Sequence, residues 1–242
     1  MDSNKKTARL AGFLYLLMVL TYIFSLGYAP QRFLIEGDAV ATINHIAQAE
    51  WMFRLAIVVG MVACAVFMLQ LFVLYKLLGP VSRNAAVLMF AFGIAHLPLF
   101  FVGHVDELNL LSLLQENRYG NVFTTEQLHA QVLLLTDAYK NSVRVNEIFM
   151  GLWLVPFGYL VFKSGFLPRI LGIWLVLNSF PYLIDFFKQL MDLEYTTPAV
   201  VRYMMQAATV GEFATCLWLL IMGARESPGA MSPKGVPATS AA

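Results

Sequence analysis

Several ionisable side chains lie within or beside stretches of this 242-residue chain that are otherwise apolar and long enough to cross a bilayer. Glu212 is near the middle of one stretch, and a charged side chain at the bilayer centre costs at least about 2.5–3.5 kcal/mol. Its carboxyl group must therefore be protonated, be paired with an Arg, or face water. Because polar groups avoid lipid, we predict that those of four stretches converge on one polar cavity. The predicted lining residues are Arg54, Arg144, Glu147, Asn178, Tyr182, Asp185 and Glu212.

A second set of residues has the chemistry of a metal site. His96, His104 and Glu107 fall within one arc of about 80° if their stretch is helical. Together with Asp185 they offer ligands for zinc or another divalent cation, which would activate a water molecule. Zinc normally requires three or four ligands, and the chain has neither an HExxH motif nor paired CxxC motifs. The metal site is therefore kept as an alternative, no cofactor is predicted, and catalytic residues stay unassigned.

A polar stripe is predicted on the helix that begins after Thr124. The segment Thr124-Thr125-Glu126-Gln127 has the spacing of a capping box, which marks a helix N-terminus. At about 100° per residue, the polar side chains that follow share one arc of about 80°. They are Glu126, His129, Asp137, Lys140, Arg144 and Glu147. We predict an amphipathic outer helix that continues into the next apolar stretch, with this stripe either in water or forming the wall of a vestibule.

The composition indicates a membrane protein. The chain is 59% hydrophobic and 13% charged, with a mean hydropathy of +0.68, whereas soluble domains carry roughly 25% charged residues. Six apolar stretches can each cross roughly 30 Å of hydrocarbon, the fourth by recruiting the polar residues before it. They are Leu10–Ala29, Leu55–Tyr75, Ala85–Gly103, Ile148–Phe162, Phe166–Phe187 and Met204–Gly223. We predict an all-α, polytopic membrane bundle of six transmembrane helices; an alternative with seven spans makes Leu128–Val145 cross as well.

The distribution of charge predicts the orientation of this bundle. Lys and Arg gather in the cytoplasmic connections of membrane proteins. If the N-terminus is cytoplasmic, the inner side carries only two acidic residues, Asp2 and Glu226. Its basic residues are Lys5, Lys6, Arg9, Lys76, Arg83, Lys163, Arg169, Arg225 and Lys234. We predict that both termini are cytoplasmic, that the protein lies in a bacterial cytoplasmic membrane, and that residues 1–226 form one domain followed by a disordered tail, 227–242.

The same composition narrows the partners. A net charge of +1 and the absence of a long basic tract give no reason to expect nucleic acid. The expected partners are the lipid bilayer and a small polar or amphipathic ligand, and the oligomeric state stays open. Cys64 and Cys216 lie in apolar stretches, so we predict free buried thiols rather than a disulfide.

Several segments carry a resemblance to a known family. Lys5-Lys6-Thr7-Ala8-Arg9 is followed by Gly12-Phe13-Leu14-Tyr15-Leu16, and Glu50-Trp51-Met52-Phe53-Arg54-Leu55 comes later. The most specific segment is Lys163-Ser164-Gly165-Phe166-Leu167-Pro168-Arg169-Ile170-Leu171-Gly172. In these motifs, and over nearly its whole length, the chain resembles a bacterial family of multi-pass membrane proteins catalogued as a domain of unknown function. The resemblance implies an integral membrane bundle and no established activity.

These residues favour a binding function. Our interpretation is an integral membrane protein whose outward-facing polar cavity binds a small ligand or relays ions or protons. One alternative is an intramembrane metal-dependent hydrolase acting on lipids or lipid-linked substrates, and another is a structural or partner-binding subunit. Local helix openings at Gly93, Pro98, Pro156 and Pro181 would shape the cavity, as such residues do near sites in membrane bundles.

Overall fold

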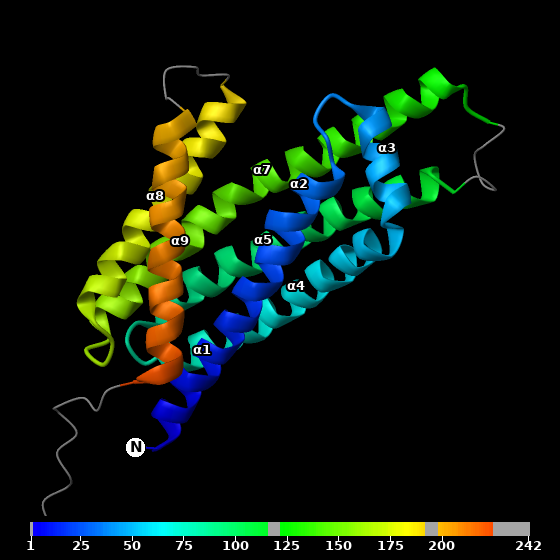
Figure 1. The fold of residues 1–242 in the computed structure, drawn as a ribbon. Coiled ribbons are helices and arrows are strands. Elements are labelled where there is room, and N and C mark those ends of the chain that lie inside the picture. Colours follow the sequence, from blue (N-terminus) through cyan, green and yellow to red (C-terminus); the bar gives the residue numbers. More distant parts are fainter. Residues whose placement is uncertain (1, 116–121, 192–197, 225–242) are drawn as a thin grey trace, which may run out of the picture.

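The chain forms an all-helical structure in the residues that the computed structural model describes, which are 2–115, 122–191 and 198–224 (Figure 1). No strand occurs in these ranges, so the predicted all-α class is confirmed there. The helices are α1 (Asp2–Tyr22), the π-helical segment η1 (Ile23–Tyr28), α2 (Ala29–Phe33), α3 (Ala39–Gln48), α4 (Glu50–Leu78), α5 (Arg83–Leu113), α7 (Thr125–Lys163), α8 (Arg169–Leu190) and α9 (Pro198–Ile221). The tail predicted over 227–242 lies outside the described residues.

Five of these helical segments are long and apolar enough to cross a membrane, judged by length and composition. One is the continuous helical run Asn4–Phe33, made of α1, η1 and α2, and the others are α4, α5, α7 and α8. The apolar part of α9 that the structure describes, Thr209–Ile221, is shorter. Five of the six predicted spans are therefore present as candidates, and the sixth stays a prediction.

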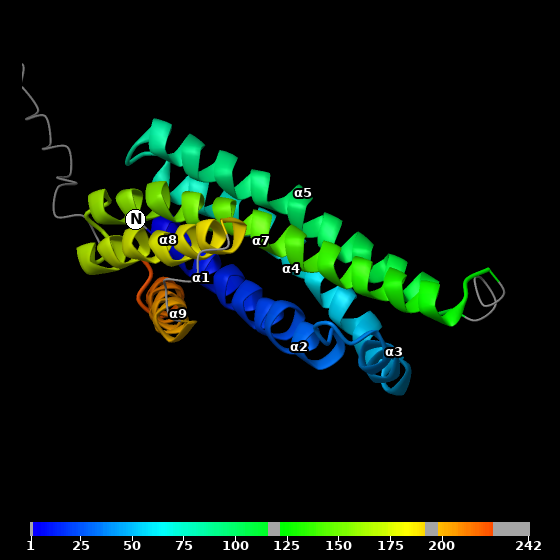
Figure 2. The same ribbon diagram turned by 90° about the horizontal axis from the view of Figure 1, so that it is seen from above.

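The long helices form a ring in which each contacts the next (Figures 1 and 2). Going around, α1 packs on α4, α4 on α5, α5 on α7, α7 on α8, α8 on α9, and α9 packs back on α1. The first and last helices are joined where an Arg9 Nη2 atom donates to the Ile221 carbonyl oxygen at 3.2 Å. The start of α1 and the end of α9 therefore lie at the same end of the bundle.

Glycines let neighbouring helices of this ring approach closely. The Gly12 position on α1 lies against the backbone of Leu220 on α9, with no room for a Cβ atom between them. Gly158 on α7 and Gly172 on α8 meet in the same way. Small residues at helix interfaces are typical of membrane bundles. Helices in lipid gain little from the hydrophobic effect, so they associate through close van der Waals packing.

Large apolar side chains cover the outward faces of the helices. Phe13, Phe72, Leu88 and Phe180 each keep more than half of their surface exposed, although they come from four different helices. An apolar surface of this extent is unfavourable in water and is well solvated by lipid chains. The pattern agrees with the membrane class predicted from composition.

The helix α7 runs without interruption from the predicted capping box to the end of the fourth predicted span. The Thr124 backbone N donates to Gln127 Oε1 at 2.9 Å, and the Gln127 backbone N donates to Thr124 Oγ1 at 3.2 Å. The capping box is thus confirmed. Because one continuous helix cannot reverse direction, the seven-span alternative, in which Leu128–Val145 crosses separately, is wrong.

No helix ends at the glycine and proline positions where local openings were predicted. The assigned helices continue through Gly93 and Pro98 in α5, through Pro156 in α7 and through Pro181 in α8. The backbone instead changes at η1, where the first helix widens into π-helical turns. This change carries no sequence signal as strong as proline, so the sequence did not point to it.

A further helix, α3, was not expected. Its N-terminus is capped by Asp38, whose Oδ1 accepts from the Ala41 backbone N at 2.8 Å. It packs against α4 and α7 at the end of the bundle away from the N-terminus (Figure 1). A cluster of buried apolar side chains forms there, including Phe33, Ile46 and Phe53.

Candidate functional site

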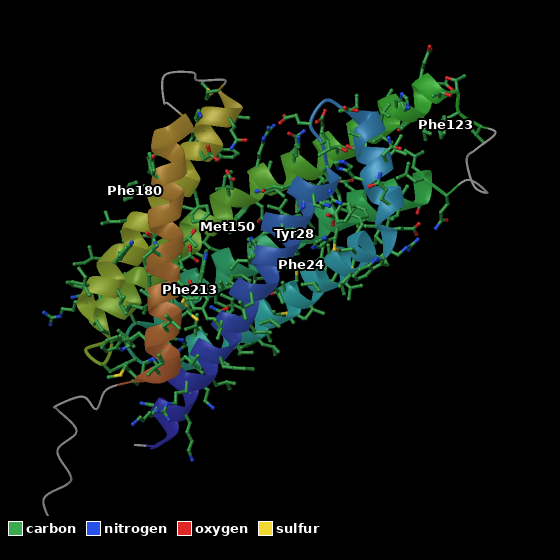
Figure 3. The ribbon with its side chains drawn as sticks, viewed as in Figure 1. Phe24, Tyr28, Phe123, Met150, Phe180 and Phe213 are labelled. Atoms are coloured by element: carbon green, nitrogen blue, oxygen red, sulfur yellow. The ribbon has the colours of Figure 1, made fainter. Side chains whose placement is uncertain are left out.

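A cavity of about 220 Å³ is lined by residues from the ring of helices. Every helix of the ring supplies lining: four aromatic residues, several aliphatic ones, and few polar groups. The lining residues are Met18, Val19, Tyr22, Ile23, Leu26, Phe67, His96, Met150, Trp153, Tyr182, Thr209 and Glu212. In Figure 3, Met150 lies between α9 and the first helix. The cavity is therefore a property of the whole ring, assembled from residues far apart in sequence.

The carboxyl group of Glu212 on α9 is held by two tyrosines on two other helices. Its Oε2 accepts from the Tyr15 hydroxyl of α1 at 3.0 Å, and its Oε1 accepts from the Tyr182 hydroxyl of α8 at 3.1 Å. Each carboxylate oxygen has a second lone pair that can accept another donor. The tyrosines thus fix the carboxyl group and leave acceptor capacity for a bound molecule.

A second polar pair lies on the cavity wall. Tyr22 Oη and His96 Nε2 are 3.1 Å apart, and His96 is buried against the Phe67 ring at a centroid distance of 5.2 Å. Tyr22 is the last residue of α1, and the π-helical segment that follows supplies Ile23 and Leu26 to the lining. Short π-helical insertions are rare and frequently occur at functional sites.

Aromatic rings form much of the remaining wall. Phe67 and Trp153 are perpendicular, with centroids 5.4 Å apart. Trp153 in turn stacks on Phe157 at 5.2 Å with only 10° between the ring planes. Phe67 and Trp153 thus present aromatic surface to the same cavity that Glu212 lines.

The structure brings together part of the predicted cavity set. Glu212 and Tyr182 line the cavity and share a hydrogen bond. Glu147, Arg144 and Asp185 are not among the lining residues; Glu147 interacts electrostatically with Arg144 and Asp185, and also with Tyr182 of the lining.

The other predicted members have local partners. Arg144 Nη1 donates to Asn141 Oδ1 at 3.1 Å, and Asp185 Oδ2 accepts from Gln189 at 2.7 Å. Asn178 is buried on α8, beside the Gly211 position of α9.

Arg54 lies apart from the cavity. Its guanidinium group pairs with Glu50 one helical turn earlier, at 2.6 Å, and about half of each side chain is exposed. Pairs of this kind, at positions i and i+4, are common on helix surfaces. The structure therefore gives Arg54 a partner at the bundle surface and none in the cavity wall.

The predicted metal set is dispersed. His104 Nδ1 and Glu107 Oε2 are 2.6 Å apart, and both residues are only 2% exposed. His96, however, faces Tyr22, and Asp185 holds Gln189 on α8. Within the described ranges, no three His, Cys, Asp or Glu residues are grouped so that they could hold a metal ion. The donor set of these described residues therefore does not fit a zinc site.

The sequence interpretation missed the contribution of the first helix. Tyr15 and Tyr22 are seven residues apart, so they lie on one face of α1 two turns apart. That spacing was a usable signal, because a tyrosine hydroxyl in an apolar span needs a partner. Phe67 and Trp153 gave no comparable signal, since aromatic residues are ordinary in such spans.

Comparisons with known proteins place these features in a wider group. A family model described as "Domain of unknown function (DUF4386)" matches residues 10–223. A relative from Archaeoglobus fulgidus, named "Uncharacterized protein", is 28% identical over 166 residues, which are 66% of this chain and 78% of the relative. No solved structure matches the chain. The family match extends from α1 to the end of α9 and so includes every residue of the cavity lining.

Proposed function

The chain belongs to the DUF4386 family of domains of unknown function, and we propose that it is an integral membrane protein whose central cavity binds a small amphipathic ligand. The predicted resemblance to a multi-pass membrane family of unknown function is confirmed by this match. Neither the family nor the relative carries a known activity, so the proposal is built from the cavity. One observation carries it: a carboxyl group held by two tyrosine hydroxyls opens onto a space with largely apolar walls.

The size of the cavity supports binding over internal packing. If Glu212, Tyr15 and Tyr182 served only to join three helices, the side chains around them would be expected to close on one another. A single buried water needs only roughly 10–15 Å³, and the cavity of about 220 Å³ is far larger. A pocket that combines apolar walls with a few fixed polar groups is typical of small-molecule sites.

The proposal includes the arrangement in the membrane. All six helices of the ring cross the bilayer, α9 included, and both termini lie on the cytoplasmic side of a bacterial cytoplasmic membrane. The sorting of Lys and Arg supports this orientation. The contact of Arg9 with the carbonyl of Ile221 supports the placement of both ends on one side of the membrane.

The binding proposal is tested with the full chain purified in detergent. Native mass spectrometry would detect molecules that co-purify with the wild type. Met150→Trp places a larger side chain on the cavity wall, whereas Leu88→Trp makes a change of similar type on the lipid-facing surface of α5. We expect a co-purifying molecule in the wild type and in Leu88→Trp, and its loss in Met150→Trp. Equal retention in both variants, or no bound molecule in any of the three, would contradict the proposal.

The two alternative functions gain no comparable support. A metal-dependent hydrolase needs ligands that converge, and His96 and Asp185 have separate partners on different helices. A purely structural role does not explain why two tyrosines hold a carboxyl group at the cavity. Ligand binding therefore accounts for more of the observed geometry than either alternative.

A further inference from the structure

The cavity has an unusual balance of charge. Glu212 is its only acidic residue among the described lining side chains, and that lining contains no Lys or Arg. His96 is the other ionisable group apart from tyrosine, and its Nε2 lies beside the Tyr22 hydroxyl. The cavity thus offers no fixed cation to an anionic ligand. A charged group that binds there would have to be a cation, which the Glu212 carboxylate can neutralise.

Glu212 has no counter-ion among the side chains that the structure describes. The partners that the structure gives its two oxygens are the hydroxyls of Tyr15 and Tyr182. No Lys, Arg or His in the described part of the chain forms an ion pair with it. Acidic residues inside membrane bundles typically pair with a cation or serve an ion or substrate pathway. A ligand that carries its own positive charge would complete this site.

The aromatic walls have the complementary chemistry. Four aromatic side chains, Tyr22, Phe67, Trp153 and Tyr182, line the same cavity as the carboxyl group. Aromatic faces attract cations by about 0.5–2 kcal/mol each, most strongly where water is excluded, and aromatic cages are used to recognise quaternary ammonium groups. A carboxylate that shares its cavity with aromatic rings favours an organic cation over a strongly hydrated metal ion.

The rest of the lining determines the body of the ligand. Met18, Val19 and Met150 are apolar, and methionine side chains adapt to irregular shapes. The ammonium group would lie by Glu212 and its aromatic neighbours, with a short hydrocarbon part among these residues. We propose that the cavity binds small lipophilic ammonium cations. This inference rests on the proposed ligand-binding function and specifies its ligand class.

The test uses probes that differ mainly in charge. Binding to the purified full chain is measured by isothermal titration calorimetry with choline and with butyltrimethylammonium. The first control is the neutral isostere of choline, an alcohol in which carbon replaces nitrogen. The second is the carboxylate anion with the same carbon skeleton as that alcohol. We expect both cations to bind, and the neutral and anionic molecules to bind at least roughly tenfold more weakly. Equal affinity for the neutral isostere, or no binding of either cation, would overturn the inference.

Variants assign the binding to the site. Glu212→Gln removes the charge and should lower cation affinity by roughly thirtyfold or more, whereas Glu126→Gln makes the same change at an exposed position in the first turn of α7 and should have no effect. Unchanged affinity in Glu212→Gln overturns the inference. If Glu212→Gln does not fold, Phe67→Leu is used in its place and should lower cation affinity roughly fivefold. Unchanged cation affinity in Phe67→Leu would also overturn the inference.

Failure of the inference can be separated from failure of the proposed function. If the neutral isostere binds as well as choline, and Met150→Trp abolishes the binding of both, the cavity binds ligands without selecting charge. If none of the probes binds and no molecule co-purifies, both proposals are wrong.

Discussion

The imidazole ring of His104 on α5 lies directly against the bare backbone of Gly60 on α4, so that a Cβ atom at Gly60 would overlap the Nε2 edge of the ring. The opposite ring nitrogen, Nδ1, is 2.6 Å from Glu107 Oε2. The ring is thus clamped between a glycine on one helix and a carboxyl group on its own. This clamp fixes the spacing between α4 and α5 away from the cavity.

Gly60→Ala should therefore destabilise the protein by about 1–3 kcal/mol, because the added methyl group must displace His104 or separate the helices. Gly27→Ala is the matched control, since a Cβ there meets nothing within 4 Å. Thermal unfolding in detergent can be followed with a thiol-reactive dye, because Cys64 and Cys216 are free and buried. A melting temperature lowered equally by both substitutions would show that the clamp has no specific role.

The His104–Glu107 pair should show strong coupling. Glu107→Leu leaves a buried imidazole without its partner, and His104→Leu leaves a buried carboxyl group without its own. Each single change should cost about 1–3 kcal/mol, because an unsatisfied buried polar group bears its full desolvation penalty. The double change should cost less than the sum, with a coupling of about 0.5–3 kcal/mol in the same unfolding assay. Additive effects would indicate that the pair contributes nothing beyond the two separate side chains.

The six-span arrangement predicts which positions a membrane-impermeant maleimide can reach. In a cysteine-free background, Gln48→Cys, on the exposed end of α3, should react in intact cells. Asn4→Cys, Asn84→Cys and Ser232→Cys should react only after the membrane is permeabilised. If α9 did not cross, Ser232→Cys would instead react from outside, while the other three positions kept their pattern.

The capping box of α7 should stabilise only its first turns. Thr124→Ala removes the hydroxyl that accepts from the Gln127 backbone N and should cost about 1 kcal/mol locally. Hydrogen exchange should become faster in peptides that begin near Thr125, and exchange around Met150 should not change. Uniformly faster exchange along α7 would show that the whole helix depends on its cap.

The sequence was informative where a signal is local. Apolar runs predicted α4 as Leu55–Tyr75, and the helix extends to Glu50–Leu78 because the hydrogen-bonded backbone continues beyond its most apolar part. Glu212 stood out in the same way, since an acidic residue in the middle of an apolar stretch can be recognised without knowing the fold.

Partners distant in sequence could not be predicted. Tyr15 and Glu212 are 197 residues apart, and their hydrogen bond exists because α1 closes the ring against α9. The sequence analysis placed Arg54 in the polar cavity and did not identify which acid would pair with it. The nearest one, Glu50, was four residues away and formed the pair. Arg54 thus pairs with a nearby acid on its own helix and does not join the polar groups predicted to converge on the cavity.

The uninterrupted course of α7 gives the molecule a mechanical property. At about 1.5 Å per residue its 39 residues form a rod roughly 58 Å long, nearly twice the roughly 30 Å of hydrocarbon. A large part of this rod must project from the membrane or tilt steeply within it. The same continuous helix carries Lys140, whose Nζ lies 3.5 Å from Glu36 Oε1, and Trp153, which lines the cavity. A force applied to the projecting turns would therefore act on the cavity wall through one continuous helix.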